Sequence, residues 1–492
     1  MREQLPALQV VIPLLGAVLC ALLRRGAIAW VIALSVSWTL AVVSVLLLLQ
    51  VLDTGPISYA MGDWAPPWGI EYRVDALSGF LLVLISVVGA VIMPYAHTSV
   101  CDEIEERNQG WFYTMYLLCL AGLLGIAITG DAFNAFVFLE ISSLSTYAMI
   151  ALGRDRRALL AAYQYLIMGT IGATMYVIGV GLLYSMTGSL NLVDIASRLG
   201  DVETSRPILA AIAFITVGVS LKLALFPLHV WLPNAYAFAP SVATAFLAAT
   251  ATKVAVYLLL RFLFSVFGVA IVVQGLPVTE IFLVLSLAAM FGASIVAIFQ
   301  EDIKRMLAYS SVAQIGYITL GIALASQTGL TGGIVHLANH AMTKAALFLL
   351  LGAVVYRIGA CKITDMAGLA KKMPVTMGAF VVAGLGIIGT PGTAGFISKW
   401  YLASGALEKG WWWLALLIVA SSLLSVIYIG RVVEVIWFRP LAKAGEKASE
   451  MPLQMMIPAL VLVAATIYFG FDTTWTADVA ARAAQVLLPG AP

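Results

Sequence analysis

Five ionisable side chains lie in the middle of long apolar stretches of the sequence. They are Glu140, Lys222, Lys253, Lys344 and Lys399. A charged group at the centre of a membrane-spanning helix costs about 2.5–3.5 kcal/mol on insertion scales, so such groups face a bundle interior, pair or meet water. Because burial disfavours charged lysine and a nearby carboxylate restores the charge, a Glu–Lys pair of variable separation can load and release a proton. The alternatives are a static ion pair or a snorkelling lysine.

A second group of titratable side chains shares one face of a single predicted helix. In "HLANHAMTKAALFLLLG", His336, His340 and Lys344 follow one another at intervals of four residues, a spacing that covers about 12 Å of helix. Histidine titrates near neutral pH and relays protons readily. We therefore predict a proton relay, with structural hydrogen bonding or a metal site as alternatives; the sequence shows no third metal ligand nearby.

Two of the lysines lie beside helix breaks. Pro227 follows Lys222 in "GVSLKLALFPLHVWLP", and "GTPGTAGFISKW" places Pro391 before Lys399. Proline removes a backbone donor, and the freed carbonyls are tolerated at membrane depth only where protein or water satisfies them. We expect a hydrated gap at each lysine. His229 follows the first break, where either a place on the proton path or a structural role is expected.

The composition identifies the environment of these groups. Hydrophobic residues make up 62% of the 492 and charged residues 11%, whereas soluble proteins carry about a quarter charged residues. The chain is therefore a polytopic membrane protein. A net charge of +2 indicates no nucleic-acid partner, and the four cysteines form no CxxC pair. We expect no metal, cofactor or enzymatic centre in this chain, and assign any linked electron chemistry to another chain.

The apolar segments predict an all-α fold with about fourteen transmembrane helices, since each crossing needs about 20 apolar residues. The expected spans are 8–23, 27–51, 75–96, 111–129, 132–152, 159–187, 207–236 (broken), 240–266, 278–299, 303–325, 329–357, 374–407 (broken), 411–437 and 452–471. The loop at 52–74 is expected to form a small extramembrane hairpin.

An internal repeat relates the two broken spans. "SSLSTYAMIALG" at 142–153 matches "SSVAQIGYITLG" at 310–321 in five of twelve positions, and the breaks lie at a similar offset. Paired broken helices in two repeats indicate a transport site near the midplane. We predict two inverted five-helix repeats. The expected divisions are three helices and the hairpin loop at 1–110, the first repeat at 111–266, the second repeat at 278–437, and a C-terminal helix and tail at 438–492.

The distribution of basic residues predicts the orientation. More lysines and arginines fall in loops on one side when both termini lie outside, and such loops are cytoplasmic. We expect a multi-pass protein of a bacterial or archaeal cell membrane with both termini outside. Arg261 near a helix end is expected to snorkel to the interface, and Asp75 to cap the helix after the hairpin loop.

The whole chain resembles the proton-translocating antiporter-type subunits shared by complex I, membrane-bound hydrogenases and Mrp cation/proton antiporters. The motifs that carry the resemblance are "LKLALFPLHVWLPNAYAFAPS", "ATKVAVYLLLR", "HLANHAMTKAALFLLLG" and "GTPGTAGFISKW". The resemblance implies a central polar axis. The matching positions are Glu140, Lys222, Lys253, His336 or His340, and Lys399.

Departures from the family pattern favour one member. Lys399 stands where M-type chains of complex I carry glutamate, "PNAYAFAP" replaces an acidic form, and the chain ends about twenty residues after the last span. These features resemble the D-type subunit of Mrp antiporters, with an N-type chain of a complex I relative as the runner-up and a hydrogenase subunit also open.

The predicted function is proton conduction within a multisubunit Na⁺/H⁺ antiporter, together with other membrane subunits. Protons would load Lys222 or Lys253, cross along His336 and His340 and leave near Lys399, while Glu140 tunes Lys222. The alternatives are a redox-driven proton-pumping subunit and a purely structural subunit.

Overall fold

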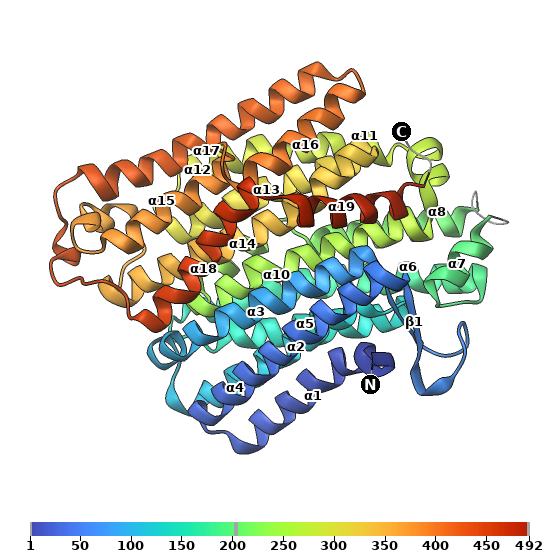
Figure 1. The fold of residues 1–492 in the computed structure, drawn as a ribbon, viewed down its shortest axis with the longest axis horizontal. Coiled ribbons are helices and arrows are strands. Elements are labelled where there is room, and N and C mark those ends of the chain that lie inside the picture. Colours follow the sequence, from blue (N-terminus) through green and yellow to red (C-terminus); the bar gives the residue numbers. More distant parts are fainter. Residues whose placement is uncertain (1, 201–204, 490–492) are drawn as a thin grey trace.

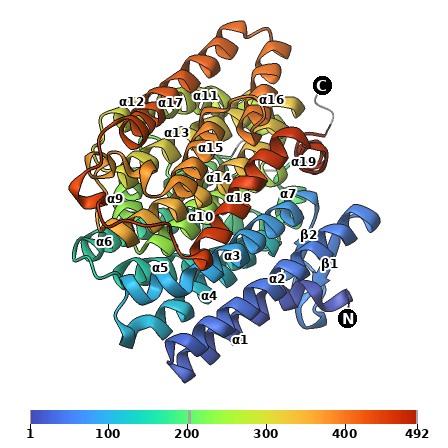
Figure 2. The same ribbon diagram turned by 60° about the vertical axis from the view of Figure 1, so that its left-hand side comes forward.

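Long apolar segments of this chain form helices because a helix satisfies its own backbone N–H and C=O groups where no water is available. The computed structural model describes residues 2–200 and 205–489, and the helices lie side by side in one bundle (Figures 1 and 2). The N-terminal helices form one edge of the bundle and α17 the opposite edge.

The helices of the first half are α1 (Leu5–Leu23), α2 (Gly26–Thr54), α3 (Ala76–Glu103), α4 (Glu106–Ile128), α5 (Ala132–Ala151), α6 (Arg157–Thr187), α7 (Leu192–Leu199), α8 (Arg206–Lys222), α9 (Trp231–Phe238) and α10 (Ser241–Leu260). Those of the second half are α11 (Val278–Ala288), α12 (Ser294–Ile298), α13 (Ile303–Leu324), α14 (Gln327–Ile358), α15 (Pro374–Ile388), α16 (Ala394–Glu408), α17 (Trp412–Phe438), α18 (Leu453–Phe471) and α19 (Thr474–Leu487). Two antiparallel strands form the predicted hairpin, β1 (Ile57–Ala60) and β2 (Glu71–Val74). The short 3-10 turns are η1 (Arg2–Gln4), η2 (Met61–Asp63), η6 (Ile363–Met366), η7 (Leu369–Lys371) and η8 (Lys443–Gly445), and the π-helical segments are η3 (Arg261–Val266), η4 (Ala270–Gly275) and η5 (Ala289–Ala293).

The membrane-spanning helices match the expected spans. Among the described residues, 12 helices are long and apolar enough to cross a membrane, and they coincide with the unbroken spans of the sequence. The two spans expected to be broken are broken, into α8 with α9 and α15 with α16. The all-α polytopic fold is therefore confirmed. The segment after the last span, expected as a tail, contains the additional helix α19.

The connecting segments gather at two opposite ends of the bundle. We call one end the hairpin face: β2 is bridged to the α4–α5 loop through Tyr72 and Thr129, and that loop is bridged to the start of α7 through Asp131 and Asn191. The other end is the basic-loop face, where Ile104 is bridged to Gly153. In Figure 1, β1 and α7 lie at the right, while the α17–α18 connection lies at the left. The bridged loops therefore lie on common sides of the bundle, as the alternation of the predicted spans requires.

Matching backbone hydrogen bonds support the inverted repeat. Asp131 caps α5 and is bridged to Asn191, while Asp302 caps α13 and is bridged to Lys362. Both members of the second pair lie 171 positions after those of the first (302 − 131 and 362 − 191). The first pair is on the hairpin face and the second on the basic-loop face, so α5 and α13 run in opposite directions. The divisions at 110, 266 and 437 remain predictions.

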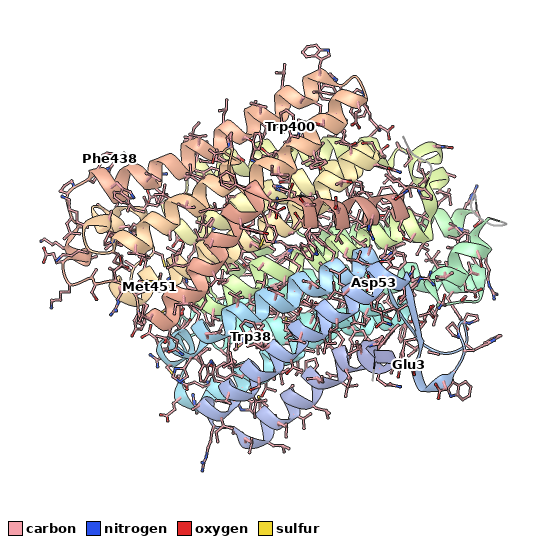
Figure 3. The ribbon with its side chains drawn as sticks, in the orientation of Figure 1. Glu3, Trp38, Asp53, Trp400, Phe438 and Met451 are labelled. Carbon is pink, nitrogen blue, oxygen red and sulfur yellow. The ribbon has the colours of Figure 1, made fainter. Side chains whose placement is uncertain are left out.

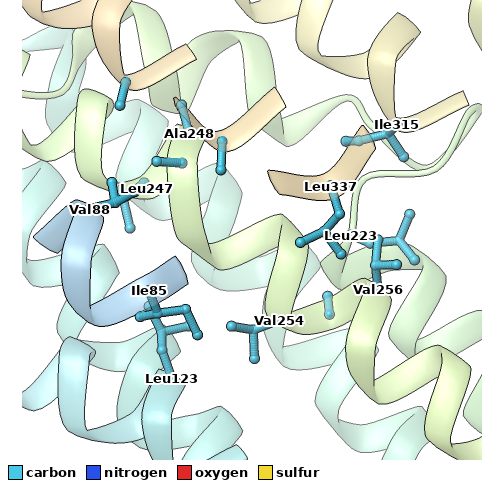
Figure 4. Packing of buried hydrophobic residues seen from close by; sticks show 14 of the residues in the cluster. Ile85, Val88, Leu123, Leu223, Leu247, Ala248, Val254, Val256, Ile315 and Leu337 are labelled. Atoms are coloured by element: carbon cyan, nitrogen blue, oxygen red, sulfur yellow. The ribbon is translucent and has the colours of Figure 1, made fainter. Parts of the chain in front are cut away.

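The interior of the bundle is built around α10 and α14. Ile85 and Val88 of α3, Leu123 of α4 and Leu337 of α14 pack with the apolar side chains of α10 (Figure 4). Small residues let these helices approach closely: a Cβ added at Gly352 of α14 would meet side chains of α3 and α10 at 2.4 and 2.6 Å. The polar residues of α10 and α14 are therefore enclosed by protein.

The outer helices carry apolar surfaces. Trp38 of α2 and Trp400 of α16 are about half exposed or more, at 49% and 63%. Phe438 lies at the periphery in Figure 3, and Glu3 and Asp53 lie at the other end of the bundle from Met451. Such surfaces suit contact with lipid or neighbouring subunits. The unpredicted helix α19 instead packs its buried alanines against α3 and α14.

Candidate proton path

Lys222 is the last residue of α8, and its ammonium faces α5. Lys222 Nζ donates to Ser143 Oγ at 2.6 Å and lies 3.5 Å from Tyr147 Oη. Glu140 Oε1 is 3.7 Å from the same nitrogen, which is longer than a direct hydrogen bond. Glu140, Ser143 and Tyr147 share one face of α5 because they are three and four residues apart. The lysine thus has one carboxylate neighbour within reach of a small rearrangement.

The break after α8 leaves carbonyls that other groups satisfy. Trp231 Nε1, at the start of α9, donates to Leu221 O at 3.0 Å, and the backbone of Leu225 donates to Ser220 O at 3.0 Å. A cavity of about 30 Å³ adjoins Lys222 and is also lined by serine and threonine side chains of α5. It has the size of about two water molecules, at 10–15 Å³ each. The predicted hydrated gap therefore has a polar cavity as its counterpart.

Lys253 lies in the middle of α10 and is 1% exposed. Its ammonium contacts the carbonyl of Ala248 and lies 3.3 Å from Thr252 Oγ1. Both acceptors belong to the part of α10 nearer the basic-loop face, so the lysine side chain is directed toward that end. Among the described residues, no carboxylate lies within ion-pair distance of this nitrogen.

Both ring nitrogens of His336, on α14, lie within hydrogen-bond distance of side chains from neighbouring helices. Its Nε2 lies 3.0 Å from Gln314 Oε1 and its Nδ1 lies 2.8 Å from Ser398 Oγ. Ser398 also lies 3.1 Å from the carbonyl of Gly395, to which its hydroxyl can donate. With that serine bond to Gly395, both imidazole nitrogens donate and the ring is cationic. With the hydroxyl turned to Nδ1, the ring is neutral. One hydroxyl rotation therefore accommodates either protonation state.

His340 and Lys344 continue this face of α14. The ring of His340 lies 6.3 Å from that of His336, centroid to centroid. Neither ring nitrogen of His340 has a hydrogen-bond partner in the described part of the chain, which is uncommon for a buried polar group. Lys344 is fully buried; it donates to Leu307 O at 2.8 Å and contacts Ser310 Oγ. Lys253 lies within electrostatic range of all three residues.

Lys399 lies at the second break. Its ammonium donates to the carbonyls of Ile387 and Ile388, at 3.0 and 2.9 Å, and to Ser422 Oγ at 3.0 Å. It also lies 4.5 Å from the ring centroid of Tyr317. The two carbonyls end α15, where the helix dipole favours a cation.

The two breaks share this arrangement. Each lysine is tied to the end of the first half-helix: Lys222 is the last residue of α8, and the Lys399 ammonium binds the last carbonyls of α15. In each case a tyrosine from an earlier helix of the same repeat contacts the lysine. Tyr147 of α5 contacts Lys222, and Tyr317 of α13 contacts Lys399. The breaks differ in charge, since only Lys222 has a carboxylate within ion-pair distance among the described residues.

His229 stands apart from the other predicted residues. Its ring stacks on Phe226 with centroids 5.1 Å apart and meets Tyr309 edge-on at 6.2 Å. No hydrogen bond within the described ranges joins it to the other seven. The other seven, which we call the row, lie on α5, α8, α10, α14 and α16. Of these helices, α10 packs against α8 and α14, and α14 packs against α16.

Sequence reasoning missed several partners of the row. These are Tyr147, Gln314, Tyr317, Ser398 and Ser422. The available signal was a polar residue within an expected span, but the contacts join different helices and depend on their packing. Within the described part of the chain, no three His, Cys, Asp or Glu side chains gather as metal ligands do.

Comparisons with known proteins place this arrangement in a family. The family model described as "NADH:quinone oxidoreductase/Mrp antiporter, TM" matches residues 129–425, more than half of the chain. The N-type subunit of NADH-quinone oxidoreductase from Desulforudis audaxviator is 43% identical, with 96% of each chain covered. The D-type subunit of the Na(+)/H(+) antiporter from Alkalihalophilus pseudofirmus is 30% identical, over 87% of this chain and 86% of the relative.

Solved structures agree with this result. A chain of the Mrp complex from Dietzia sp. superposes with a TM-score of 0.90 at 26% identity, covering 99% of this chain and 98% of that one. The chain therefore belongs to the NADH:quinone oxidoreductase/Mrp antiporter transmembrane family.

Proposed function

We propose that this chain is the proton-conducting subunit of an Mrp-type Na⁺/H⁺ antiporter. The observation that carries the proposal is the Lys222–Glu140 separation of 3.7 Å beside a broken helix. At this distance a small movement of α8 or α5 makes or breaks a direct contact. Because the charged lysine is stabilised only when the carboxylate is near, that movement changes the proton affinity of Lys222.

The route proposed for the proton follows the row of buried groups. A proton released from Lys222 passes through the polar cavity toward α10 and Lys253. From there His340, whose ring nitrogens lack hydrogen-bond partners in the described chain, accepts it and hands it to His336. The rotation of the Ser398 hydroxyl lets His336 hold or release the proton, and Lys399 receives it at the second break.

Lys344 and His229 have lesser parts in this proposal. Lys344 shares a face of α14 with the histidines and adds a cation whose charge opposes a second proton on His340. His229 borders the first break and lies at the margin of the path. Neither contacts Lys222 or Lys399 through a hydrogen bond within the described ranges.

The coupling to a cation gradient rests on the relatives. The relative from Alkalihalophilus pseudofirmus is a Na(+)/H(+) antiporter subunit, and the superposed chain belongs to an Mrp complex. We propose that this chain likewise assembles with other membrane subunits in a bacterial or archaeal cell membrane. The basic-loop face lies in the cytoplasm and the hairpin face outside, as the distribution of basic residues predicts.

A second candidate function is proton pumping in a redox-driven complex. The specific observation in its favour is the 43% identity to the N-type subunit of NADH-quinone oxidoreductase. The same row of residues would carry protons, and the driving chemistry would lie on partner chains. Copurification separates the two: iron–sulfur chains in the isolated complex favour the redox candidate, and small membrane subunits alone favour the antiporter.

The decisive test of proton conduction is a Lys222→Ala variant in the intact complex. In everted vesicles, with a pH-sensitive dye as readout, we expect coupled proton movement to be lost while the complex still assembles. Lys409→Ala, which removes an exposed lysine at the turn before α17, is the matched control and keeps activity. Transport by the Lys222 variant near the unmutated level would contradict the proposal.

A further inference from the structure

The proton path described above makes no use of a buried ion pair at the hairpin face. Arg261 contacts Asp75 Oδ1, and the two residues are only 9% and 6% exposed. The expected snorkelling of Arg261 is therefore wrong, because its guanidinium is mostly buried and pairs with Asp75 instead of extending to the interface. A buried pair of this kind is weak support for stability alone, since each charge loses its water. We therefore ask whether this ion pair has a role in proton movement.

The ion pair continues one face of the helix that carries Lys253. Lys253, Tyr257 and Arg261 follow one another at intervals of four residues, and the helix continues from α10 into η3. They therefore lie in a line on one face, about 12 Å long. Between the two cations, the Tyr257 ring lies 5.0 Å from the guanidinium, and its hydroxyl donates to Ala127 O at 2.9 Å.

A cavity of about 330 Å³, lined by both apolar and charged side chains, adjoins the ion pair from the hairpin face. Asp75, Tyr257 and Arg261 are part of its lining, and Arg73 and Ser265 stand at its exposed rim. A cavity of this size with charged and hydroxyl groups on its wall admits water. The cavity therefore gives the hairpin face access to the ion pair and to the tyrosine, which lies one helical turn from Lys253.

Asp75 is anchored in a way that fixes the pair's position. Its carboxylate accepts hydrogen bonds from the backbone of Leu77 and Ser78, at 3.1 and 3.0 Å, and so caps α3. We take Arg261 as the partner that moves, because in the described part of the chain its guanidinium donates to Asp75 alone. Separation of the two charges would therefore move the guanidinium and leave the cap in place.

We propose that the Asp75–Arg261 pair closes a second aqueous route, which connects the hairpin face to Lys253. With the pair closed, the Lys253 ammonium is directed toward the basic-loop face, as observed. With the pair open, water passes Tyr257, the lysine turns one helical turn toward it, and its ammonium loses one proton to that water. Arg261 stays protonated and Asp75 stays ionised throughout. This inference rests on the proposed proton conduction.

The test uses the intact complex in proteoliposomes with an imposed pH gradient and a trapped pH dye. Asp75→Asn keeps a side chain that caps a helix and removes the ion pair. We expect the gradient to collapse about tenfold faster or more, the factor that loss of one charge-assisted hydrogen bond gives. Adding Lys253→Met should abolish that leak. Asp131→Asn, at another helix cap on the same face, is the matched control and should not leak.

The outcomes separate this inference from the proposed function. Coupled transport by the unmutated complex in the same vesicles tests proton conduction itself. If that transport is present and Asp75→Asn assembles without a leak, or leaks equally with Lys253→Met, the second route is refuted. Arg261→Gln breaks the pair from the other side and should leak as well. Loss of assembly in both variants would assign the pair a purely structural role and overturn the inference.

Discussion

A substitution at Gly169 of α6 would displace the tyrosine that contacts Lys222. A Cβ at this position would lie 1.8 Å from Tyr147 Oη and 2.9 Å from its Cζ, whereas ordinary contact begins at 3.4 Å. The hydroxyl must therefore retreat by about 1.6 Å, the difference between these two contact distances. The Lys222–Tyr147 contact is already 3.5 Å long, and the added Cβ would also lie 3.4 Å from Lys222 Nζ, so the movement disturbs the surroundings of this lysine.

The cost of Gly169→Ala follows from what surrounds the tyrosine. Tyr147 meets Tyr165 edge-on with ring centroids 4.7 Å apart, and Tyr165 stacks on Trp231 at 3.8 Å. The ring cannot move without displacing this stack, and such overpacking costs about 1–3 kcal/mol. We expect a lower melting temperature of the purified complex and slower proton transport in everted vesicles.

Two further variants make the test specific. Gly181→Ala lies on the same helix with no atom within 4 Å of its Cβ, so it should be neutral or stabilising by up to about 1 kcal/mol. Combining Gly169→Ala with Tyr147→Phe removes the closest atom and should recover part of the lost stability. If Gly169→Ala matches Gly181→Ala in melting temperature and transport, the placement of Tyr147 against Gly169 and Lys222 is wrong.

Three other predictions concern the second break and the basic-loop face. Ser422→Ala removes one of three acceptors of Lys399; we expect proton transport to fall about tenfold, and an unchanged rate would contradict a role for this contact. Gly395→Ala places a Cβ 2.0 Å from a backbone oxygen of α15, whereas Gly378→Ala meets nothing within 4 Å, so only the first should lower the yield of assembled complex on native gels. Burial raises the pKa of the Cys361 thiol at the basic-loop face, and only the thiolate form reacts with maleimide. In a variant that lacks the other cysteines, labelling of Cys361 by an impermeant maleimide should therefore rise about tenfold per pH unit from pH 7 to 9. That labelling should occur in everted vesicles and not from outside intact cells, and the reverse pattern would refute the proposed orientation.

The sequence was sufficient for the spans because each crossing is a local property. Residues around Lys222 and Lys399 predicted both broken helices, since proline and glycine act on the backbone where they stand. The sequence did not predict the burial of Arg261, because its place near a helix end suggested that the side chain could reach the membrane interface. Its partner Asp75 is 186 residues away, and only the packing of α10 against α3 brings them together.

The short helix α19 was missed for a related reason. Its 14 residues are too few to span a membrane and combine alanines with scattered charges. A search for membrane spans therefore passed over it, although its alanines recur on one face in the pattern of an amphipathic helix. Likewise the bond between His336 and Gln314 joins α14 to α13, and their shared depth in the bundle was not readable from either segment alone.

The charge difference between the two breaks has a consequence for how many protons the row holds. Of the bases in the row, only Lys222 has a carboxylate, Glu140, within ion-pair distance in the described part of the chain. The other lysines and the two histidines become uncompensated cations when they bind a proton. Two unit charges 10 Å apart repel by about 1.7 kcal/mol at an effective dielectric constant of 20. A proton on one base therefore discourages a second on its neighbour. On the proposed path, a proton that arrives at Lys253 would therefore favour release of a proton already held by a neighbouring base.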